Sequence, residues 1–262
     1  MRGRRSAGSI SPDTLLFGLV TFVFVLVAHA VAYLTHEYAH SLTAWSLGWM
    51  AKPFGIDYGP GTVYNFIFLG DVSDNVNYVP IFASGHGIDA AVIALAGPFL
   101  GNGLLYFIIY ALASRAWIAS RRYLLTFLYW LSLMCAANVW SYVPTRSLTT
   151  HADIALAAKG FGISTWAFFP FVLIPSLYIT YHFMTRMFSR VYERITANLP
   201  ANLALFIAFT GCWYFAFYVG DEIDGSYGLI SQAIAILSRY LLFPLSVAYL
   251  SSRYANAVRE AE

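Results

Sequence analysis

Residues 14–40 read TLLFGLVTFVFVLVAHAVAYLTHEYAH, an apolar run that ends in a histidine–glutamate–histidine motif. Residues 14–35 carry no charge over 22 positions, and a helix needs about 20 apolar residues to cross a bilayer. The run is longer than the hydrophobic region of a signal peptide, which spans about 7–15 residues. We therefore expect a retained transmembrane helix with the motif near its end.

The composition of the whole chain indicates a membrane protein. The chain has 262 residues, of which 59% are hydrophobic and 11% are charged, whereas soluble domains usually carry about 25% charged residues. A soluble protein of this length could not bury so many apolar residues in its core, so we expect the lipid bilayer to surround the chain. The net charge of +2 is too small to indicate a nucleic-acid-binding protein.

Six segments are long and apolar enough to span a membrane. They cover residues 14–47, 89–114, 123–143, 164–184, 200–220 and 229–250. We expect an all-α polytopic protein that forms a single membrane domain over residues 1–262. The segment 51–88 between helices one and two alternates polar and apolar residues at positions 62–68, which predicts a short β-like, membrane-associated hairpin. Its edge would offer a strand to an extended substrate.

Positive charges predict the orientation of the helices, because cytoplasmic loops carry an excess of lysine and arginine. One set of loops and chain ends holds eleven arginines, whereas the opposite loops hold three basic residues. The eleven are Arg2, Arg4, Arg5, Arg115, Arg121, Arg122, Arg186, Arg190, Arg194, Arg253 and Arg259, and the three are Lys52, Arg146 and Lys159. We expect a multi-pass protein of a prokaryotic cell membrane with both termini in the cytoplasm.

Residues 36–40 read His-Glu-Tyr-Ala-His and match the H-E-x-x-H pattern of zinc metalloproteases. On a helix, His36 and His40 lie on one face, one turn apart, so both imidazoles can bind the same ion, one Zn2+ per chain. Glu37 points about 100° round the helix from His36, where it can act as the catalytic base toward zinc-bound water. Ionisable groups are costly inside a membrane, so we interpret these residues as functional.

A catalytic zinc site needs a further protein ligand, and the residues alone do not choose it. The candidates outside the first helix are His86, Asp89, His151, Asp153 and the acidic residues at 221–224. His29 lies two helical turns before His36, about 10 Å away, which is too far to share the metal. We interpret it as a hydrogen-bonded interior histidine, with a proton relay as the alternative.

Three segments resemble the site-2 protease family of intramembrane zinc proteases. Residues 36–61 read HEYAHSLTAWSLGWMAKPFGIDYGPG, residues 94–102 read ALAGPFLGN, and residues 138–153 contain an Asn…Pro…Asp pattern. This resemblance covers about residues 20–160, and it implies a metalloprotease-like core over 14–160 with additional transmembrane helices over 164–250. The chain departs from the family in having Ile154 where Gly normally follows the Asp, and it lacks an inserted peptide-binding domain.

The resemblance also implies roles for single residues. The Asp of the third segment is the third zinc ligand in the family, which implies Asp153, with His151 as an alternative ligand or a residue that supports the ligands. Asn102 and Asn138 match family residues that help to hold the substrate, and an interhelical hydrogen bond would explain each of them equally well. Arg146 lies close to this segment, either to stabilise an oxyanion or as an anchor at the membrane interface.

The function implied by the resemblance is hydrolysis of peptide bonds in or near transmembrane segments, with a membrane-protein helix as substrate. The alternative is a non-proteolytic subunit of a larger membrane complex, bound to partner subunits. A lipid-modifying metalloenzyme or a metal transporter would need histidines and acidic residues on several helices, and only the first helix is rich in them. The charge count places the motif near the outer face of the membrane, whereas the family resemblance implies a site nearer the cytosol.

Overall fold

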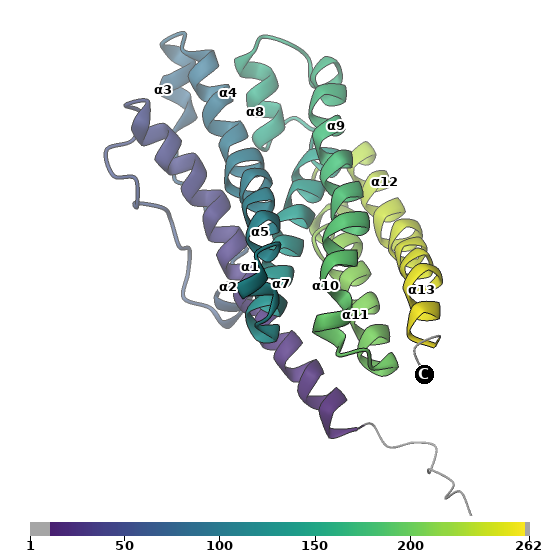
Figure 1. Ribbon diagram of the computed structural model, residues 1–262. Coiled ribbons are helices and arrows are strands. Elements are labelled where there is room, and N and C mark those ends of the chain that lie inside the picture. Colours follow the sequence, from purple (N-terminus) through teal and green to yellow (C-terminus); the bar gives the residue numbers. More distant parts are fainter. Residues whose placement is uncertain (1–10, 260–262) are drawn as a thin grey trace, which may run out of the picture.

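The computed structural model describes residues 11–259, except for the side chains of residue 221 and residues 255–259. These residues form one elongated helical bundle (Figure 1). Its elements are α1 (Pro12–Ser46), α2 (Val63–Phe68), α3 (Tyr78–Ala83), α4 (Gly87–Leu95), η1 (Ala96–Leu104), α5 (Leu105–Ala113), α6 (Ala116–Ala119), α7 (Arg122–Trp140), η2 (Ser141–Thr145), α8 (Asp153–Gly160), α9 (Thr165–His182), η3 (Phe183–Met187), α10 (Phe188–Thr196), α11 (Pro200–Cys212), η4 (Trp213–Phe217), η5 (Asp221–Asp224), α12 (Leu229–Leu237), η6 (Ser238–Leu242) and α13 (Phe243–Arg259). Elements η1, η2, η3, η4 and η6 are π-helical, and η5 is a 3₁₀-helix.

Six continuous helices are long and apolar enough to cross a membrane, as the sequence predicts. They cover residues 12–46, 87–113, 122–145, 165–196, 200–217 and 229–254. The fourth runs to residue 196 where apolarity predicts an end at 184, because α10 continues it as an amphipathic helix. In α10, Val191 and Ile195 are buried while Arg190 and Arg194 are exposed. The helix therefore extends past its apolar part.

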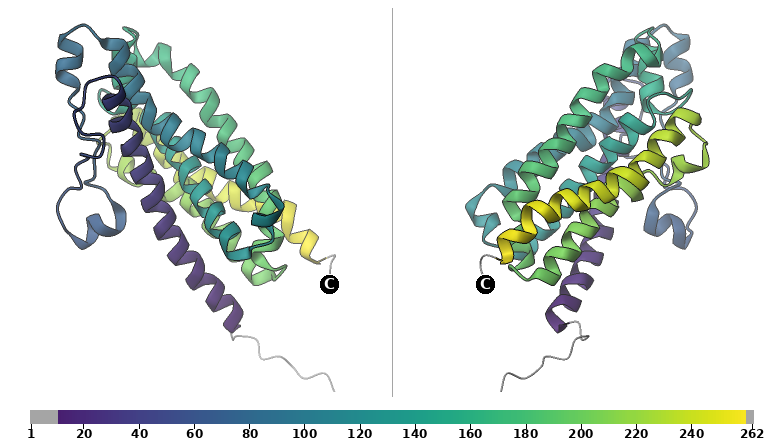
Figure 2. Two further views of the ribbon diagram at one scale, coloured as in Figure 1. Left: turned by 60° about the vertical axis from the view of Figure 1, so that its left-hand side comes forward. Right: turned by 90° about the vertical axis from the view of Figure 1, so that its right-hand side faces the viewer.

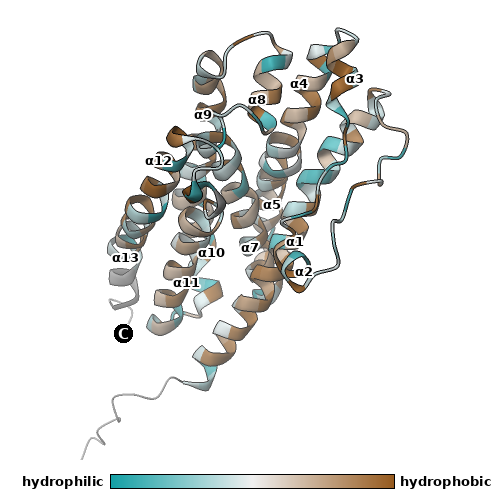
Figure 3. Cartoon of the chain, turned by 180° about the vertical axis from the view of Figure 1, so that it is seen from behind, coloured by the Kyte–Doolittle hydropathy of each residue, from teal (hydrophilic) through white to brown (hydrophobic). Residues whose placement is uncertain are grey.

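The third spanning helix occupies the centre of the bundle. In its most apolar stretch of 18 residues, 83% of the residues are buried. The corresponding share is 33% for the first helix and 17% for the sixth. Tyr129 and Trp130 on α7 pack against Phe206 on α11, with ring centroids 4.4 and 5.5 Å apart. Hydrophobic residues dominate along the helices, whereas the loops before and after α2 carry several hydrophilic residues (Figure 3). Because α7 precedes residue 160 and α11 follows it, the contacts between these two helices place both parts of the chain in one core.

The prediction of a hairpin between helices one and two is wrong. No strand occurs within residues 11–259, and the alternating stretch at 62–68 forms the short helix α2. The segment keeps a single antiparallel bridge, in which Asp57 and Ser73 exchange backbone hydrogen bonds of 3.0 and 2.9 Å. The described chain thus offers no strand edge to a substrate here.

Polar side chains explain why this stretch turns into a helix. Thr62 caps α2 by accepting a hydrogen bond from the Asn65 backbone N–H at 3.1 Å. The buried Asn65 side chain donates to the Tyr58 carbonyl at 2.7 Å and accepts from the Asp71 N–H at 3.0 Å. Asn65 thereby ties the two arms of the segment together, which an extended strand would not allow.

Helix α1 and the π-helical η1 cross at very short range. An ideal Cβ on Gly101 would lie 2.7 Å from the Thr35 carbonyl oxygen and 2.9 Å from the His36 Cα. Membrane helices associate through small residues that let their backbones approach, because lipid supplies no hydrophobic drive between them. The wide π-helical turn carries Pro98, which has no N–H to donate, on the same segment.

The two ends of the bundle differ in charge. The α5–α7 loop meets the α10–α11 turn through hydrogen bonds from Arg122 Nε to the Ile195 carbonyl (3.0 Å) and from Arg194 to the Ser120 carbonyl (2.8 Å). The start of α1 and the end of α13 lie at this arginine-rich end, whereas α3, α8 and the end of α1 lie at the opposite one (Figure 1). The basic residues Arg2, Arg4 and Arg5 lie outside the described residues.

Replacing Gly101 by alanine should destabilise the fold. The added methyl group would press on the α1 backbone, and over-packing of this kind typically costs about 1–3 kcal/mol. Thermal unfolding of the purified protein in detergent measures the effect as a lower midpoint.

Gly18 provides the matched control on α1, because an ideal Cβ there has no neighbour within 4 Å. Gly18→Ala should leave the midpoint unchanged or raise it. Equal midpoints for Gly101→Ala and the wild type would show that the crossing tolerates a side chain.

Candidate metal centre

Three side chains converge between α1 and the start of α8. His36 Nε2 lies 3.2 Å from Asp153 Oδ2, and His40 Nε2 lies 3.4 Å from the same oxygen. The two Nε2 atoms are 3.1 Å apart. Both histidines are almost completely buried. The helical spacing brings the histidines together, and the chain fold adds a carboxylate from 113 residues further along the chain.

Hydrogen bonds on the far side of each imidazole set its tautomer. A backbone carbonyl can only accept, so His40 Nδ1 donates to the Ile93 carbonyl, 2.7 Å away. The Asn102 amide nitrogen donates to an α1 carbonyl at 3.0 Å, so its oxygen faces His36 Nδ1 at 2.9 Å and accepts its proton. In the neutral rings both Nε2 atoms therefore present lone pairs to one another and to the carboxylate. Three lone-pair donors at this range repel each other unless a cation lies between them.

The donor set fits a zinc ion with one open position. At zinc–ligand distances of about 2.0–2.1 Å, tetrahedral donors lie roughly 3.3 Å apart, which matches the separations of 3.1, 3.2 and 3.4 Å. Two imidazoles and one carboxylate form a ligand set of catalytic zinc enzymes, where the fourth position takes water or substrate. His36, His40 and Asp153 can therefore hold a metal ion.

Asp153 is held as an anion by its surroundings. Burial raises the pKa of its carboxyl, but where a proton on an imidazole takes the place of the cation, attraction to His40 and hydrogen bonds from the histidines outweigh burial and hold the pKa below its ordinary value. The residue before it, Ala152, has a φ of 76°, in the region that favours glycine. Such strain costs about 1–3 kcal/mol and persists only where the surroundings enforce it. The enforced turn aims the first residue of α8 at the two histidines.

A glycine contact ties α8 to the bundle. An ideal Cβ on Gly87, at the start of α4, would lie 2.7 Å from the Gly160 carbonyl oxygen at the end of α8. A Cβ on Gly160 would in turn lie 2.9 Å from the Ala91 Cβ. The two helices thus touch along their backbones. Helix α4 continues directly into η1, which packs against α1 at the two histidines. The contact between α4 and α8 therefore helps to hold Asp153, the first residue of α8, near the histidines.

The cluster opens into a cavity of about 660 Å³. Glu37 lines this cavity beside His36, His40 and Asp153, and only 6% of its surface is exposed. Within residues 11–259, no group donates a hydrogen bond to the Glu37 carboxylate. It is therefore free to exchange a proton with a water molecule or ligand in the cavity.

The asparagines predicted to hold substrate lie in different places. Asn102 is completely buried, does not line the cavity, and uses its amide on His36 and α1. The interpretation of Asn102 as an interhelical hydrogen bond is confirmed, and this bond positions the His36 imidazole. Asn138 lines the cavity. Its amide oxygen is buried and accepts no hydrogen bond from the described part of the chain.

Arg146 also lines the cavity, but it is bound to the protein. Its guanidinium forms a buried ion pair with Glu222 and lies over the rings of Tyr142 and Tyr227, 4.8 and 4.7 Å from their centroids. His151 is exposed, stacks on Tyr227 at 4.7 Å and stays outside the cluster. The structure thus brings Asp153, and not His151, to the two histidines.

The other candidate ligands are engaged elsewhere. Asp89 accepts a hydrogen bond from Trp49 Nε1 at 2.9 Å, and His86 contacts Ser84. His29 Nε2 lies 2.9 Å from the Phe68 carbonyl and its Nδ1 lies 3.1 Å from the Tyr218 hydroxyl. The interpretation of His29 as a hydrogen-bonded interior histidine is confirmed. It joins α1 to the last residue of α2 and to Tyr218, which follows η4.

Among the cavity residues that escaped the sequence analysis as parts of the site, three carry polar groups beside the cluster or charges in the cavity wall: Asp74, Tyr142 and Arg239. Burial raises the pKa of the Asp74 carboxyl, which lines the cavity from the segment after α2. Tyr142 packs its ring on that of His36, with centroids 4.2 Å apart. Arg239 lines the cavity from the sixth spanning helix. Its charge within an apolar helix was the one available signal, because charges at membrane depth usually face a cavity.

Comparison of the chain with protein-family models, with curated proteins and with solved structures finds no match.

Replacing Gly97 by alanine should abolish metal binding. An ideal Cβ there would lie 2.6 Å from His36 Nε2 and closer still to His40 Nε2, in the space between the donor atoms. Elemental analysis of the purified variant should find less than about one tenth of a metal ion per chain, because both donors are blocked.

Gly103→Ala on the same π-helix is the control, since its nearest contact would be an ordinary 3.4 Å. This variant should keep its metal. A full metal complement in Gly97→Ala would contradict the position assigned to the ion.

Proposed function

We propose that this chain is an intramembrane zinc metalloprotease that hydrolyses peptide bonds in or near transmembrane segments of membrane proteins. One observation carries the proposal. The three donor atoms of His36, His40 and Asp153 converge within 3.4 Å of one another, with the Glu37 carboxylate beside them in the same cavity. A metal-binding site needs only the three donors, whereas an unpaired carboxylate next to the open position is what hydrolysis requires.

The ligand chemistry favours zinc. Two imidazoles and one carboxylate suit Zn2+ among the biological metals, and an open fourth position distinguishes a catalytic from a structural site. Once bound, zinc would polarise the peptide carbonyl and lower the pKa of its water toward about 7. Asn102 and the Ile93 carbonyl hold the imidazoles in place, as the outer partners of metal-bound histidines do.

Glu37 is the acid–base group of the proposed reaction. Its carboxylate takes a proton from the attacking water and later gives this proton to the amine that leaves, so the peptide bond breaks without net proton change. We assign Asn138, which lines the cavity, to holding the bound segment. Arg146 has its charge balanced by Glu222, so we assign it to the cavity wall.

The size of the cavity bears on the form of the substrate. A space of about 660 Å³ accepts a short piece of chain, whereas a whole spanning helix is about 10 Å wide and 30 Å long. A helix also hides its carbonyls in hydrogen bonds, so the substrate segment must unwind before attack. We propose that an unwound, extended segment of a membrane protein enters the cavity.

The setting supports this assignment. The chain is a multi-pass membrane protein by its six apolar helices, and we propose a prokaryotic cell membrane with both termini in the cytoplasm. In that orientation the arginine-rich end of the bundle faces the cytosol. The metal centre, near the end of α1 that lies beside α3 and α8, would then face the outer side.

Metal analysis tests the zinc ligands. The protein purified in detergent should contain about one zinc ion per chain, as expected for a site with three protein donors. His36→Ala and Asp153→Ala should each lose it. His151→Ala is the matched control and should retain zinc, because His151 lies outside the cluster. Zinc that persists in Asp153→Ala would place the third ligand elsewhere.

Replacement of Glu37 by glutamine should separate binding from turnover. The variant keeps the shape of the side chain and should retain full zinc, but it cannot take up a proton. Hydrolysis should fall at least about 10²-fold, the usual contribution of a general base. The assay reconstitutes each protein in vesicles with a mixture of single-span peptides and identifies cleaved products by mass spectrometry.

The activity of the wild-type protein decides between a protease and a non-proteolytic subunit. Cleavage within the spanning segments by the wild type, lost in Glu37→Gln, supports the protease. Full zinc without cleavage of any peptide in the mixture would contradict it, and would favour a non-proteolytic subunit of a membrane complex.

A further inference from the structure

A second cavity lies at the arginine-rich end of the bundle, far from the metal centre. It measures about 300 Å³ and is bounded by the start of α1, the start of α7 and the α10–α11 turn. The first turns of α1 lean away from the other helices here (Figure 2). The separation from the metal centre follows from α1, because Asp13 and His36 are 23 residues apart on one helix, about 34 Å.

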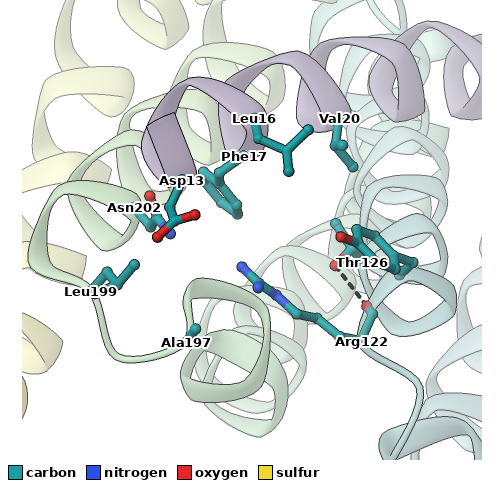
Figure 4. A pocket seen from close by; sticks show the side chains of 10 residues that line it. Asp13, Leu16, Phe17, Val20, Arg122, Thr126, Ala197, Leu199 and Asn202 are labelled. Atoms are coloured by element: carbon teal, nitrogen blue, oxygen red, sulfur yellow. Dashed lines mark hydrogen bonds between the residues drawn. The ribbon is translucent and has the colours of Figure 1, made fainter. Parts of the chain in front are cut away.

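Opposite charges face each other across this cavity without pairing. Arg122 extends into the space from α7, while Asp13 and Asn202 stand on the facing wall (Figure 4). Arg122 uses its Nε on the Ile195 carbonyl, which leaves its two terminal nitrogens for the cavity. Within the described part of the chain, neither Arg122 nor Asp13 forms an ion pair.

A buried acceptor adds a third polar group. The Asn202 amide nitrogen donates to the Thr196 carbonyl at 3.2 Å, which fixes the orientation of the amide. Its oxygen is buried and receives no hydrogen bond from residues 11–259. Buried polar atoms are normally satisfied, so this oxygen, which lies beneath the cavity wall, lacks a donor.

The cavity is polar on one side and apolar on the other. Because it lies at the start of a spanning helix, we expect it near the membrane surface. Asp13 lies in the first turn of α1, and the residues that follow on the wall are Leu16, Phe17 and Val20. Leu15 and Leu19 beside them are exposed on the outer face of the helix, where lipid chains run. Tyr123, another wall residue, is of the type that anchors at the interface.

We propose that this cavity binds the headgroup of an aminophospholipid. The phosphate lies on the free guanidinium nitrogens of Arg122, and the primary ammonium donates to the Asp13 carboxylate. An anionic headgroup without an amine would meet the Asp13 charge, and a choline headgroup has no N–H to donate. The acyl chains continue along the apolar side of α1. This site is independent of the proposed protease function.

Lipid binding by the full-length protein in detergent, followed by native mass spectrometry, tests the proposal. The probes are phosphatidylethanolamine, phosphatidylglycerol and phosphatidylcholine with identical acyl chains. The wild type should bind phosphatidylethanolamine about tenfold more tightly than the other two, the effect of charge-assisted hydrogen bonds to the ammonium. Soluble glycerophosphoethanolamine, which lacks acyl chains, should compete only weakly; full competition would point to a site for the free phosphoethanolamine group.

Two variants assign the groups. Asp13→Asn should abolish the preference over phosphatidylglycerol while keeping phosphate-dependent binding. Arg122→Gln should weaken all three lipids, and Arg122→Lys should restore part of the binding. Arg186→Gln, at an exposed arginine on the same end of the bundle, is the matched control and should change nothing. Equal affinity for the three lipids, or an Asp13→Asn variant with an unchanged preference, would overturn the proposal.

Discussion

The close approach of α1 and η1 at His36 is the constraint on which the metal centre depends. Gly97 and Gly101 leave no room for a Cβ between the two helices. This contact lets Asn102 reach His36 and lets the Ile93 carbonyl reach His40. Lipid supplies no hydrophobic force between helices, so packing of small residues and interhelical hydrogen bonds must hold this contact together. The same two features orient the metal donors.

Some polar groups inside the bundle have a hydrogen-bond or ion-pair partner, and others lack one. Arg146 and Glu222 neutralise each other, and His29 bonds to the Phe68 carbonyl and the Tyr218 hydroxyl. Burying such groups is tolerable because their partners are built in. The histidine–aspartate cluster differs, since its three acceptors face one another and a cation would complete it.

Helix α1 links two polar sites of different character. Its 35 residues span about 52 Å, longer than the roughly 30 Å hydrocarbon core of a bilayer. One end carries Asp13 at the smaller cavity, and the other carries the H-E-x-x-H motif at the larger cavity. A lipid bound at the first site would hold the otherwise loosely packed start of α1 against α7. The position of α1 in the membrane would then set the depth of the metal centre.

The amino-acid sequence by itself determined the six spanning helices and the pair of histidines. Apolar length decides whether a segment crosses a membrane, and the i, i+4 spacing places His36 and His40 on one face, so both are local properties. The family resemblance indicated Asp153 as the third zinc ligand. Residue types alone did not distinguish it from His86, Asp89, His151 and the acidic residues at 221–224. Choosing among them requires the turn at Ala152 and the contact of Gly87 with Gly160, which depend on packing between distant segments.

Only the tertiary structure decided the form of the segment after α1 and the partners of the isolated polar residues. Alternation at 62–68 predicts a strand, but the Thr62 cap and the hydrogen bonds of Asn65 favour a helical turn. Asn102, Asn138 and Arg239 look alike in sequence, as single polar residues in apolar helices. One positions a ligand and two line the cavity, because the rotation of each helix about its axis is set by its neighbours and not by its own composition.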